Sequence, residues 1–207
     1  GLGNDPINAE AQDGSGTCNA NYSHSADGNR PRIQMYTCGN RDGDLDNLVI
    51  IHEYAHGISL RLNSLGGQEQ MGEGWSDYYG LMLTMKSGDV GTDSRGIGTW
   101  LNGNGPGGPG FRAYPYSTNF GVNPHTYDAI KTAVAPHGVG SVWAEMLWEM
   151  TWELIALHGF DSDIYNGTGG NNVALALVTE GLKLQPPNAG FVDGRDAILL
   201  ADQAMYG

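Results

Sequence analysis

The residues of this chain best suited to chemistry are two histidines four positions apart with a glutamate between them. They are His52, Glu53 and His56, in the segment HEYAH. Residues four apart lie on one face of an α-helix, so the two imidazoles can bind a single zinc ion at about 2.0–2.1 Å. Glu53 would then reach a water on that ion rather than the ion itself, as the HExxH pattern requires. Histidine pairs alone are commonplace on helix surfaces, but the full pattern on an apolar helix is much more specific.

A catalytic zinc site needs a third protein ligand and an open fourth position. Glu73 is the candidate, because the 16 residues between it and His56 allow the first helix to end, turn and return. Asp77 lies one helical turn after Glu73 on the same face. Its carboxylate can accept the second ring N–H of His52 or His56, as carboxylates beside ligating histidines commonly do. The alternative is that GEGWSD is an ordinary acidic helix start favoured by the helix dipole.

Apolar periodicity predicts a mainly α-helical chain with a small β portion at the N-terminus. Residues 1–30 and 87–120 are rich in glycine and polar residues or proline, and we expect them to be irregular. We divide the chain into an N-terminal portion, 1–45, and a portion that holds the zinc helix and all later helices, 46–207. The expected elements are a strand over 32–38, helices over 48–62, 73–85, 141–157, 172–184 and 194–205, a short helix over 126–134, and a Gly-rich turn at 64–67.

The composition excludes two classes of partner. The formal net charge is −13, from 23 acidic and 10 basic residues. Such a surface repels phosphates and anionic lipids, so we expect neither nucleic acid nor membrane as a partner. No apolar run approaches the length that spans a bilayer. The N-terminus lacks the basic start and apolar stretch of a signal peptide, so we expect a mature or excised piece.

Two cysteines and two glycosylation patterns bear on the compartment. In an exported protein we expect Cys18 and Cys38 to form a disulfide, whose loop of 20 residues would stabilise the fold by roughly 3 kcal/mol. Two unpaired buried thiols are the alternative. Asn21-Tyr-Ser and Asn166-Gly-Thr match the N-glycosylation acceptor, but the pattern is too short to decide anything by itself.

A calcium site is a competing interpretation of the segment before the zinc helix. Acidic residues there have the spacing of an EF-hand loop: Asp42, Asp44, Asp46 and Glu53. The sixth loop position, which needs glycine for a sharp turn, is Asn47. We therefore expect the aspartates to cap the zinc helix and to favour its N-terminal dipole. Calcium elsewhere in this acidic chain stays open, without a place.

HEYAHG followed by GEGWSD resembles the glutamate-zincin metallopeptidases, specifically the fungalysin family of secreted peptidases, which are relatives of thermolysin. Further segments resemble the family over nearly the whole chain: NANYSHSADGNRPRIQMY, RAYPYSTN, HGVGSVWAEMLWEMTWELIALHG and LKLQPPNAGFVDGRDAILLADQ. Family members are longer on both sides, so the resemblance implies the C-terminal part of a catalytic unit with a thermolysin-like fold. It implies a secreted zinc endopeptidase with one zinc per chain, protein or peptide substrates, and an inhibitory propeptide in the precursor.

The resemblance also implies roles for individual residues. His52, His56 and Glu73 would be the zinc ligands and Glu53 the general base. Residues 1–45 would supply an edge strand in which Asn19 and Ala20 hold an extended peptide substrate. His137 would stabilise the oxyanion, and Arg112 would bind the substrate carbonyl.

Other histidines and tyrosines compete for these roles. His125 is the alternative to His137, which precedes the matching long helix. His24 is expected to be solvated in a loop, and His158 to complement a helix C-terminus. Thermolysin also uses a tyrosine between its second histidine and its glutamate ligand, where this chain has none. The substitute is Tyr114, Tyr116 or Tyr127, or the role is unfilled.

Two other functions compete with an endopeptidase. The first is a degenerate peptidase domain that binds proteins and keeps zinc as a structural ion. The presence of Glu53 argues against it, because a structural site needs no general base. The second is a zinc aminopeptidase, but the chain contains no GxMEN-like segment to anchor a free amine.

Overall fold

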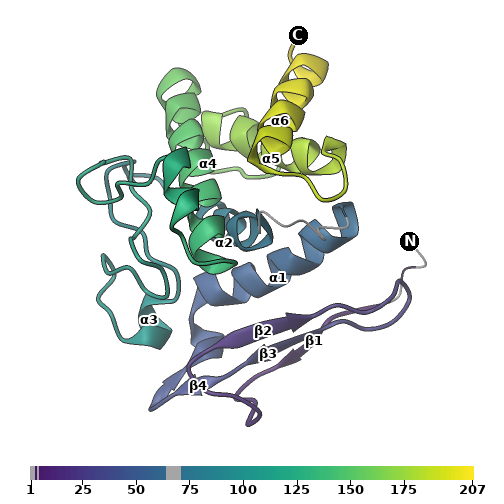
Figure 1. The fold of residues 1–207 in the computed structure, drawn as a ribbon, viewed down its shortest axis with the longest axis vertical. Coiled ribbons are helices and arrows are strands. Elements are labelled where there is room, and N and C mark those ends of the chain that lie inside the picture. Colours follow the sequence, from purple (N-terminus) through teal and green to yellow (C-terminus); the bar gives the residue numbers. More distant parts are fainter. Residues whose placement is uncertain (1–2, 4, 64–70) are drawn as a thin grey trace.

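The N-terminal part of the chain forms small β-sheets and the remainder forms helices (Figure 1). This confirms the predicted fold class. The computed structural model describes residue 3 and residues 5–63 and 71–207. The turn expected at 64–67 lies outside the described residues. Among the described helices, none is both long and apolar enough to cross a membrane.

The described strands form two small sheets. The first sheet has the order β1 (Asn8–Glu10), β3 (Arg32–Met35), β2 (Ala20–Ser23), with β1 parallel and β2 antiparallel to β3. A separate pair is formed by β4 (Thr37–Cys38) and β5 (Arg41–Asp42). In the described sheet, β2 therefore has a strand neighbour on one side only.

Two predictions about this region are wrong. The strand expected over 32–38 is interrupted at Tyr36, whose C=O accepts the N–H of Gly43 at 3.1 Å, and it resumes as β4. Residues 1–30, expected to be irregular, contain β1 and β2. Both strands are short and mostly polar, so they carry little apolar alternation. Their pairing with β3, rather than a local pattern, makes them strands.

Helix α1 (Asn47–Leu62) lies between the first sheet and α2 (Met71–Leu83) (Figure 1). Val49 joins buried residues of β2 and β3 in a small apolar cluster beneath the helix. Gly57 faces the same sheet, and a Cβ at this position would lie only 2.9 Å from Oη of Tyr22. The absence of a side chain at Gly57 thus allows α1 to approach β2 closely.

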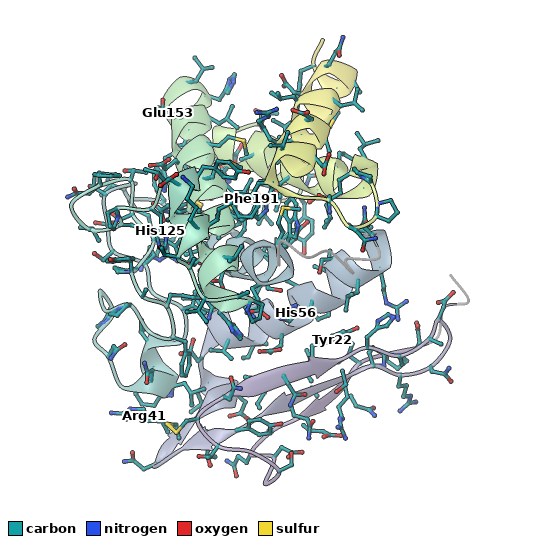
Figure 2. All side chains as sticks on the ribbon, in the orientation of Figure 1. Tyr22, Arg41, His56, His125, Glu153 and Phe191 are labelled. Atoms are coloured by element: carbon teal, nitrogen blue, oxygen red, sulfur yellow. A yellow bond between two sulfur atoms is a disulfide. The ribbon has the colours of Figure 1, made fainter. Side chains whose placement is uncertain are left out.

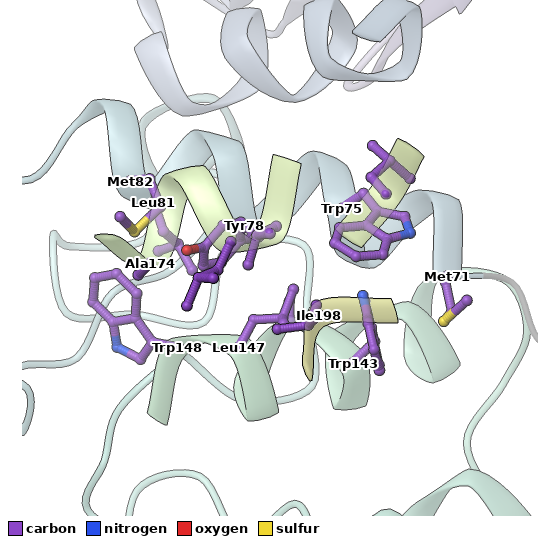
Figure 3. Packing of buried hydrophobic residues seen from close by; sticks show 14 of the residues in the cluster. Met71, Trp75, Tyr78, Leu81, Met82, Trp143, Leu147, Trp148, Ala174 and Ile198 are labelled. Carbon is purple, nitrogen blue, oxygen red and sulfur yellow. The ribbon is translucent and has the colours of Figure 1, made fainter. Parts of the chain in front are cut away.

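The later helices build the larger core around α2. Helix α4 (His137–His158) lies against α2, α5 (Gly170–Leu184) against α4, and α6 (Phe191–Met205) against α5. Figure 3 shows the buried residues between α2 and α4, where the rings of Trp75 and Trp143 meet edge-on with centroids 5.2 Å apart. Most apolar residues of α4 therefore belong to this core. The side chains buried below 2 % exposure include Trp75, Tyr78, Leu81, Trp143, Leu147 and Trp148.

Three short elements complete the described chain: η1 (Gly43–Leu45), α3 (Thr99–Asn102) and η2 (Tyr127–Lys131). The short helix expected over 126–134 is thus a 3₁₀ helix, and the irregular 87–120 segment contains α3.

The prediction that the aspartates cap the zinc helix is wrong for Asp46. This residue precedes α1, but its carboxylate makes no capping hydrogen bond there. Oδ2 instead accepts the N–H groups of Trp100 and Leu101, at 3.1 and 3.2 Å, at the start of α3. Asp46 therefore ties the start of α3 to the N-terminal end of α1. A tertiary contact has replaced the local one, because the first N–H groups of α3 also need an acceptor.

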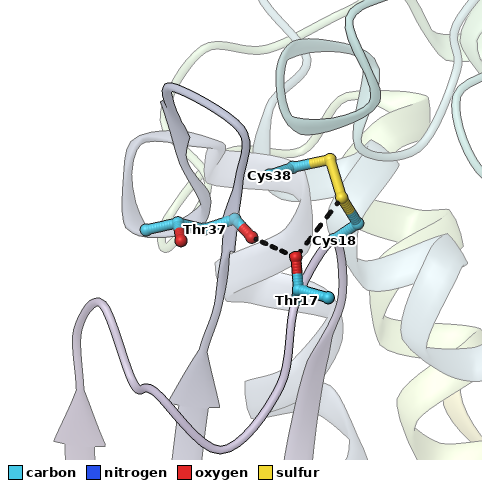
Figure 4. The surroundings of a disulfide bond; sticks show 4 residues. All are labelled: Thr17, Cys18, Thr37 and Cys38. Carbon is cyan, nitrogen blue, oxygen red and sulfur yellow. Dashed lines mark hydrogen bonds between the residues drawn. A yellow bond between two sulfur atoms is a disulfide. The ribbon is translucent and has the colours of Figure 1, made fainter.

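The two cysteines form the expected disulfide, Cys18–Cys38 (Figure 4). Cys38 lies in β4, and Cys18 lies two residues before the start of β2. Beside it, the Thr17 hydroxyl donates to the C=O of Thr37 at 3.1 Å. The bond thus anchors the start of β2 to the neighbouring sheet.

Candidate metal centre

Three side chains from α1 and α2 converge on one point: His52, His56 and Glu73. The Nε2 atoms of the two histidines are 3.2 Å apart, and Glu73 Oε2 is 3.2 Å from Nε2 of His52. Glu73 Oε1 is 3.8 Å from Nε2 of His56. Ligands at about 2.0–2.1 Å from a tetrahedral zinc ion lie roughly 3.4 Å from one another. The observed separations fit that geometry.

The surroundings of the cluster also fit a cation. Glu73 Oε2 is buried but makes no hydrogen bond, and a metal would satisfy it. Figure 2 shows His56 in the space between the sheet and the helical layer. The three ligating groups line a cavity of about 360 Å³, together with Glu53 and residues of β2. Within the described residues, no other group of histidine, cysteine and acidic side chains has a metal-binding arrangement.

A hydrogen bond fixes the orientation of His52, and burial keeps His56 neutral. Nδ1 of His52 lies 2.7 Å from Asp77 Oδ1, so its N–H points to the carboxylate and Nε2 points to the cluster. In the protein by itself, burial opposes a charge on His52, but the hydrogen bond to Asp77 and the adjacent carboxylate of Glu73 outweigh it and raise its pKa to about 9. A metal ion that binds Nε2 would therefore displace a proton from His52. Burial, and then the charge of His52, lower the pKa of His56 to about 4. His56 is therefore a neutral ligand.

Glu53 has the properties of a general base. It follows His52 on α1, is 6 % exposed, and lines the same cavity as the candidate ligands. Burial raises the pKa of its carboxyl to about 7. A group with a pKa near the working pH can both take and return a proton.

Asp77 is the centre of a buried network behind the ligands. Its carboxylate accepts a hydrogen bond from Nδ1–H of His52. It also accepts two hydrogen bonds from Arg112, at 2.6 Å from Nε and at 2.7 Å from Nη2. The hydroxyl of Tyr116 donates to Oδ2 at 2.5 Å. Burial would raise the pKa of Asp77, but Arg112 and His52 hold it well below its usual range. The carboxylate of Asp77 thus orients His52. The sequence left open whether Asp77 contacts His52 or His56, and the structure shows that it contacts His52.

The sequence predicts neither the contact of Tyr116 with Asp77 nor the burial of Glu145. Tyr116, a candidate for the tyrosine that thermolysin uses in its active site, is instead fully buried with its hydroxyl on Asp77. Glu145 is 2 % exposed on the core side of α4 and accepts from Asn123 Nδ2 at 2.6 Å and from the N–H of Ser117 at 3.4 Å. Burial raises the pKa of Glu145 to about 8. Its only signal in the sequence was an acid within an apolar helix, next to tryptophans.

His137 reaches the centre from a third helix. It is the first residue of α4, and its Nε2 lies 3.4 Å from Glu73 Oε2. The helices can meet so closely because both contact positions are glycines. A Cβ on Gly74 would lie 2.3 Å from the C=O oxygen of Gly140, and a Cβ on Gly140 would lie 2.6 Å from Cβ of Glu73. This glycine contact places His137 beside the candidate ligands.

The edge strand borders the same cavity. Asn19, Ala20 and Tyr22 are among its lining residues. The N–H of Tyr36 donates to the C=O of Asn19, and the C=O of Met35 accepts from Asp13 on the other side. Ala20, opposite Met35, is therefore in a non-hydrogen-bonded pair, and by alternation so is Tyr22. The backbone groups of Ala20 and Tyr22 point away from β3, toward the free edge.

The competing residues lie elsewhere. The described residues that line the cavity around the candidate ligands do not include Tyr114, Tyr116, Tyr127 or His125. The ring of Tyr114 meets that of His125 edge-on at 5.2 Å, and Tyr127 lies against a residue of α6. His158 ends α4 and lines a different cavity. His24, expected to be solvated, is exposed but lies at the rim of the metal cavity.

Comparisons with known proteins agree with this arrangement. The sequence profile of the family described as fungalysin metallopeptidase (M36) matches residues 1–207. The chain is 43 % identical, over 99 % of its length, to proteins named extracellular metalloproteinase 2 from Arthroderma gypseum and Trichophyton rubrum. It is 42 % identical over its whole length to the extracellular metalloproteinase mep of Aspergillus fumigatus. The chain spans 35 % of the length of each of these relatives.

Proposed function

Because the chain belongs to the fungalysin metallopeptidase family, we propose that it carries the zinc centre of an extracellular endopeptidase. His52, His56 and Glu73 would hold one zinc ion and leave its fourth position open. The observation that carries the proposal is the convergence of these three groups, at tetrahedral separations, in one cavity with Glu53. A purely structural zinc site would have no use for a buried carboxyl whose pKa is about 7.

The zinc ion would supply Lewis acidity, which lowers the pKa of water and polarises the scissile carbonyl. Glu53 takes a proton from the attacking water and delivers it to the nitrogen of the leaving amine. His137 donates Nε2–H to the developing oxyanion, and the loss of such a donor typically lowers the rate by about 10²–10³. The partial exposure of His137 leaves it accessible to a substrate.

Arg112 would bind the substrate and also hold Asp77, the carboxylate that orients His52. Asp77 engages Nε and Nη2 of its guanidinium, and an arginine has five N–H donors. The remaining donors are available to a peptide carbonyl in the cavity that Arg112 lines. Asp77, in turn, keeps the Nε2 lone pair of His52 directed at the metal.

The substrate would bind as an additional strand. An extended peptide beside β2 would pair with the outward N–H and C=O groups of Ala20 and Tyr22, which is β-augmentation. The amide of Asn19 would add a side-chain contact. Residues 1–45 would thus provide the substrate edge, and residues 46–207 the zinc helix and the helical subdomain of one catalytic unit.

The proposal extends to location and partners. The names of the relatives and the disulfide Cys18–Cys38 support an extracellular protein that acts on protein or peptide substrates. An inhibitory propeptide in the precursor follows from the family resemblance. We assign no calcium site.

The test combines metal analysis with a peptidase assay on the natural protein that carries these residues. We expect one zinc per chain, loss of activity on chelation and its return with added zinc. Glu53→Gln should retain the zinc but lose most of the turnover, because only the proton transfer is removed. Full activity of Glu53→Gln, or a variant His56→Ala that binds zinc as tightly as the natural protein, would refute the assignment.

A further inference from the structure

Two asparagines of this chain satisfy the acceptor pattern for N-glycosylation, Asn-x-Ser/Thr with x other than proline. They are Asn21, in Asn-Tyr-Ser, and Asn166, in Asn-Gly-Thr. The pattern alone cannot separate the two. Their positions in the fold do, because a bulky, hydrated sugar chain needs open solvent.

Asn21 lies within β2, the strand that borders the metal cavity. Its Nδ2 donates to the hydroxyl of Tyr36, and the residue is only partly exposed. A sugar on this nitrogen would have to fit beside Tyr36, which is only 8 % exposed. Asn21 therefore lacks the open solvent that a glycan needs.

Asn166 lies in an exposed turn between α4 and α5. Its backbone N–H and its Nδ2 donate to the two carboxylate oxygens of Asp163, at 3.0 and 3.2 Å. A glycosidic bond replaces one of the two hydrogens on Nδ2, so the other can still donate to Asp163. Thr168, the hydroxyl residue of the pattern, is also exposed. Its backbone N–H donates to the carboxylate of Asp161 at 3.2 Å. No described contact has to break for a sugar to be attached.

The neighbours of Asn166 also offer a surface for the sugar. Tyr165, Gly167 and Thr168 line a cavity of about 690 Å³ whose other walls include Leu154 and Tyr206. Tyr165 as a whole is 92 % exposed. The apolar face of a pyranose ring can cover such a surface and remove it from water. No described residue lines both this cavity and the metal cavity, so a glycan here leaves the cleft free.

We propose that Asn166 is the N-glycosylated residue of this protein and that Asn21 remains unmodified. The inference rests on the proposed function in one respect, namely export from the cell. In the transfer, Nδ2 of Asn166 forms a bond to C1 of an N-acetylglucosamine carried on a polyprenyl diphosphate. The bond from C1 to the diphosphate oxygen breaks, the lipid diphosphate leaves, and one amide proton is released. The transferase of the export pathway supplies this donor.

The experiment is peptide mass spectrometry of the natural protein secreted from a yeast host, with and without peptide N-glycosidase. Four forms are compared: the natural sequence, Asn166→Gln, Thr168→Ala and Thr168→Ser. We expect a glycan on the peptide containing Asn166 in the natural sequence and in Thr168→Ser, and none in the other two. The peptide containing Asn21 should be unmodified in all four. Thr168→Ala is the matched control, because it retains Asn166 and its bonds to Asp163.

An unmodified Asn166 in the natural sequence, or a glycan on Asn21 of the secreted protein, would overturn the inference. Zinc content and peptidase activity are measured on the same samples. Active, zinc-containing protein without a glycan at Asn166 would overturn this inference and leave the proposed function intact. A glycan at Asn166 on protein that binds no zinc would support this inference and refute the function.

Discussion

Glutamine in place of the buried Glu145 should make the protein more stable at alkaline pH and leave it unchanged in acid. Glu145 is 2 % exposed, and burial raises its pKa to about 8 from an ordinary value of 4.5. Between these two pH values the folded protein holds a proton that the unfolded chain has released. Since the folded state then binds more protons, the free energy of unfolding falls as the pH rises from about 4.5 to about 8.

The magnitude follows from the same two values. Each pKa unit corresponds to about 1.4 kcal/mol, so the penalty above pH 8 is at most about 5 kcal/mol. Glutamine has the same shape and never ionises, and its carbonyl oxygen can still accept from Asn123. It presents one acceptor fewer to Ser117, which costs roughly 1 kcal/mol. We therefore expect a net gain of about 2–4 kcal/mol for Glu145→Gln at pH 8.5.

The assay is urea unfolding at pH 4 and pH 8.5, followed by tryptophan fluorescence, since Trp143 and Trp148 on the same helix are fully buried. The two proteins should agree within about 1 kcal/mol at pH 4, where both side chains are neutral. Equal stability at pH 8.5, or a gain of the same size at both pH values, would show that Glu145 is not held in its protonated form. Glu149, one turn along the helix, adds a like charge. The variant Glu149→Gln is therefore the control, with a smaller effect because this residue is more exposed.

Three further perturbations test the elements that position the site. Tyr116→Phe removes one hydrogen bond from the carboxylate behind the ligands, and zinc affinity measured by chelator competition should fall about 10-fold or more; unchanged affinity would contradict that role. Gly140→Ala would place a Cβ 2.6 Å from Glu73 and should lower both activity and stability, the latter by about 1–3 kcal/mol in thermal unfolding. The matched Gly72→Ala, with nothing within 4 Å, should do neither. Reduction of the Cys18–Cys38 bond should destabilise by roughly 3 kcal/mol and raise KM more than it lowers kcat; an equal effect on both would argue against its anchoring of β2.

Local patterns in the sequence were sufficient for the long helices and for the three candidate ligands. The apolar spacing predicted the helices at 48–62 and 141–157, which appear as α1 and α4. The i, i+4 spacing of His52 and His56 determines their common face, because the helix repeat is the same wherever a helix forms. Glu73 followed from the requirement of zinc for a third ligand.

Contacts between distant segments decided the rest. The polar strand β2 exists because β3 pairs with it, so neither its edge position nor the outward groups of Ala20 follow from its own residues. Asp46 serves α3 rather than the helix it precedes, and Tyr116 meets Asp77 across 39 positions of chain. A side chain selects among several chemically equivalent partners by distance, and distances between segments are determined only when the helices and strands are packed. The sequence by itself therefore determined the candidate metal ligands, and the tertiary structure decided how they are oriented and what can approach them.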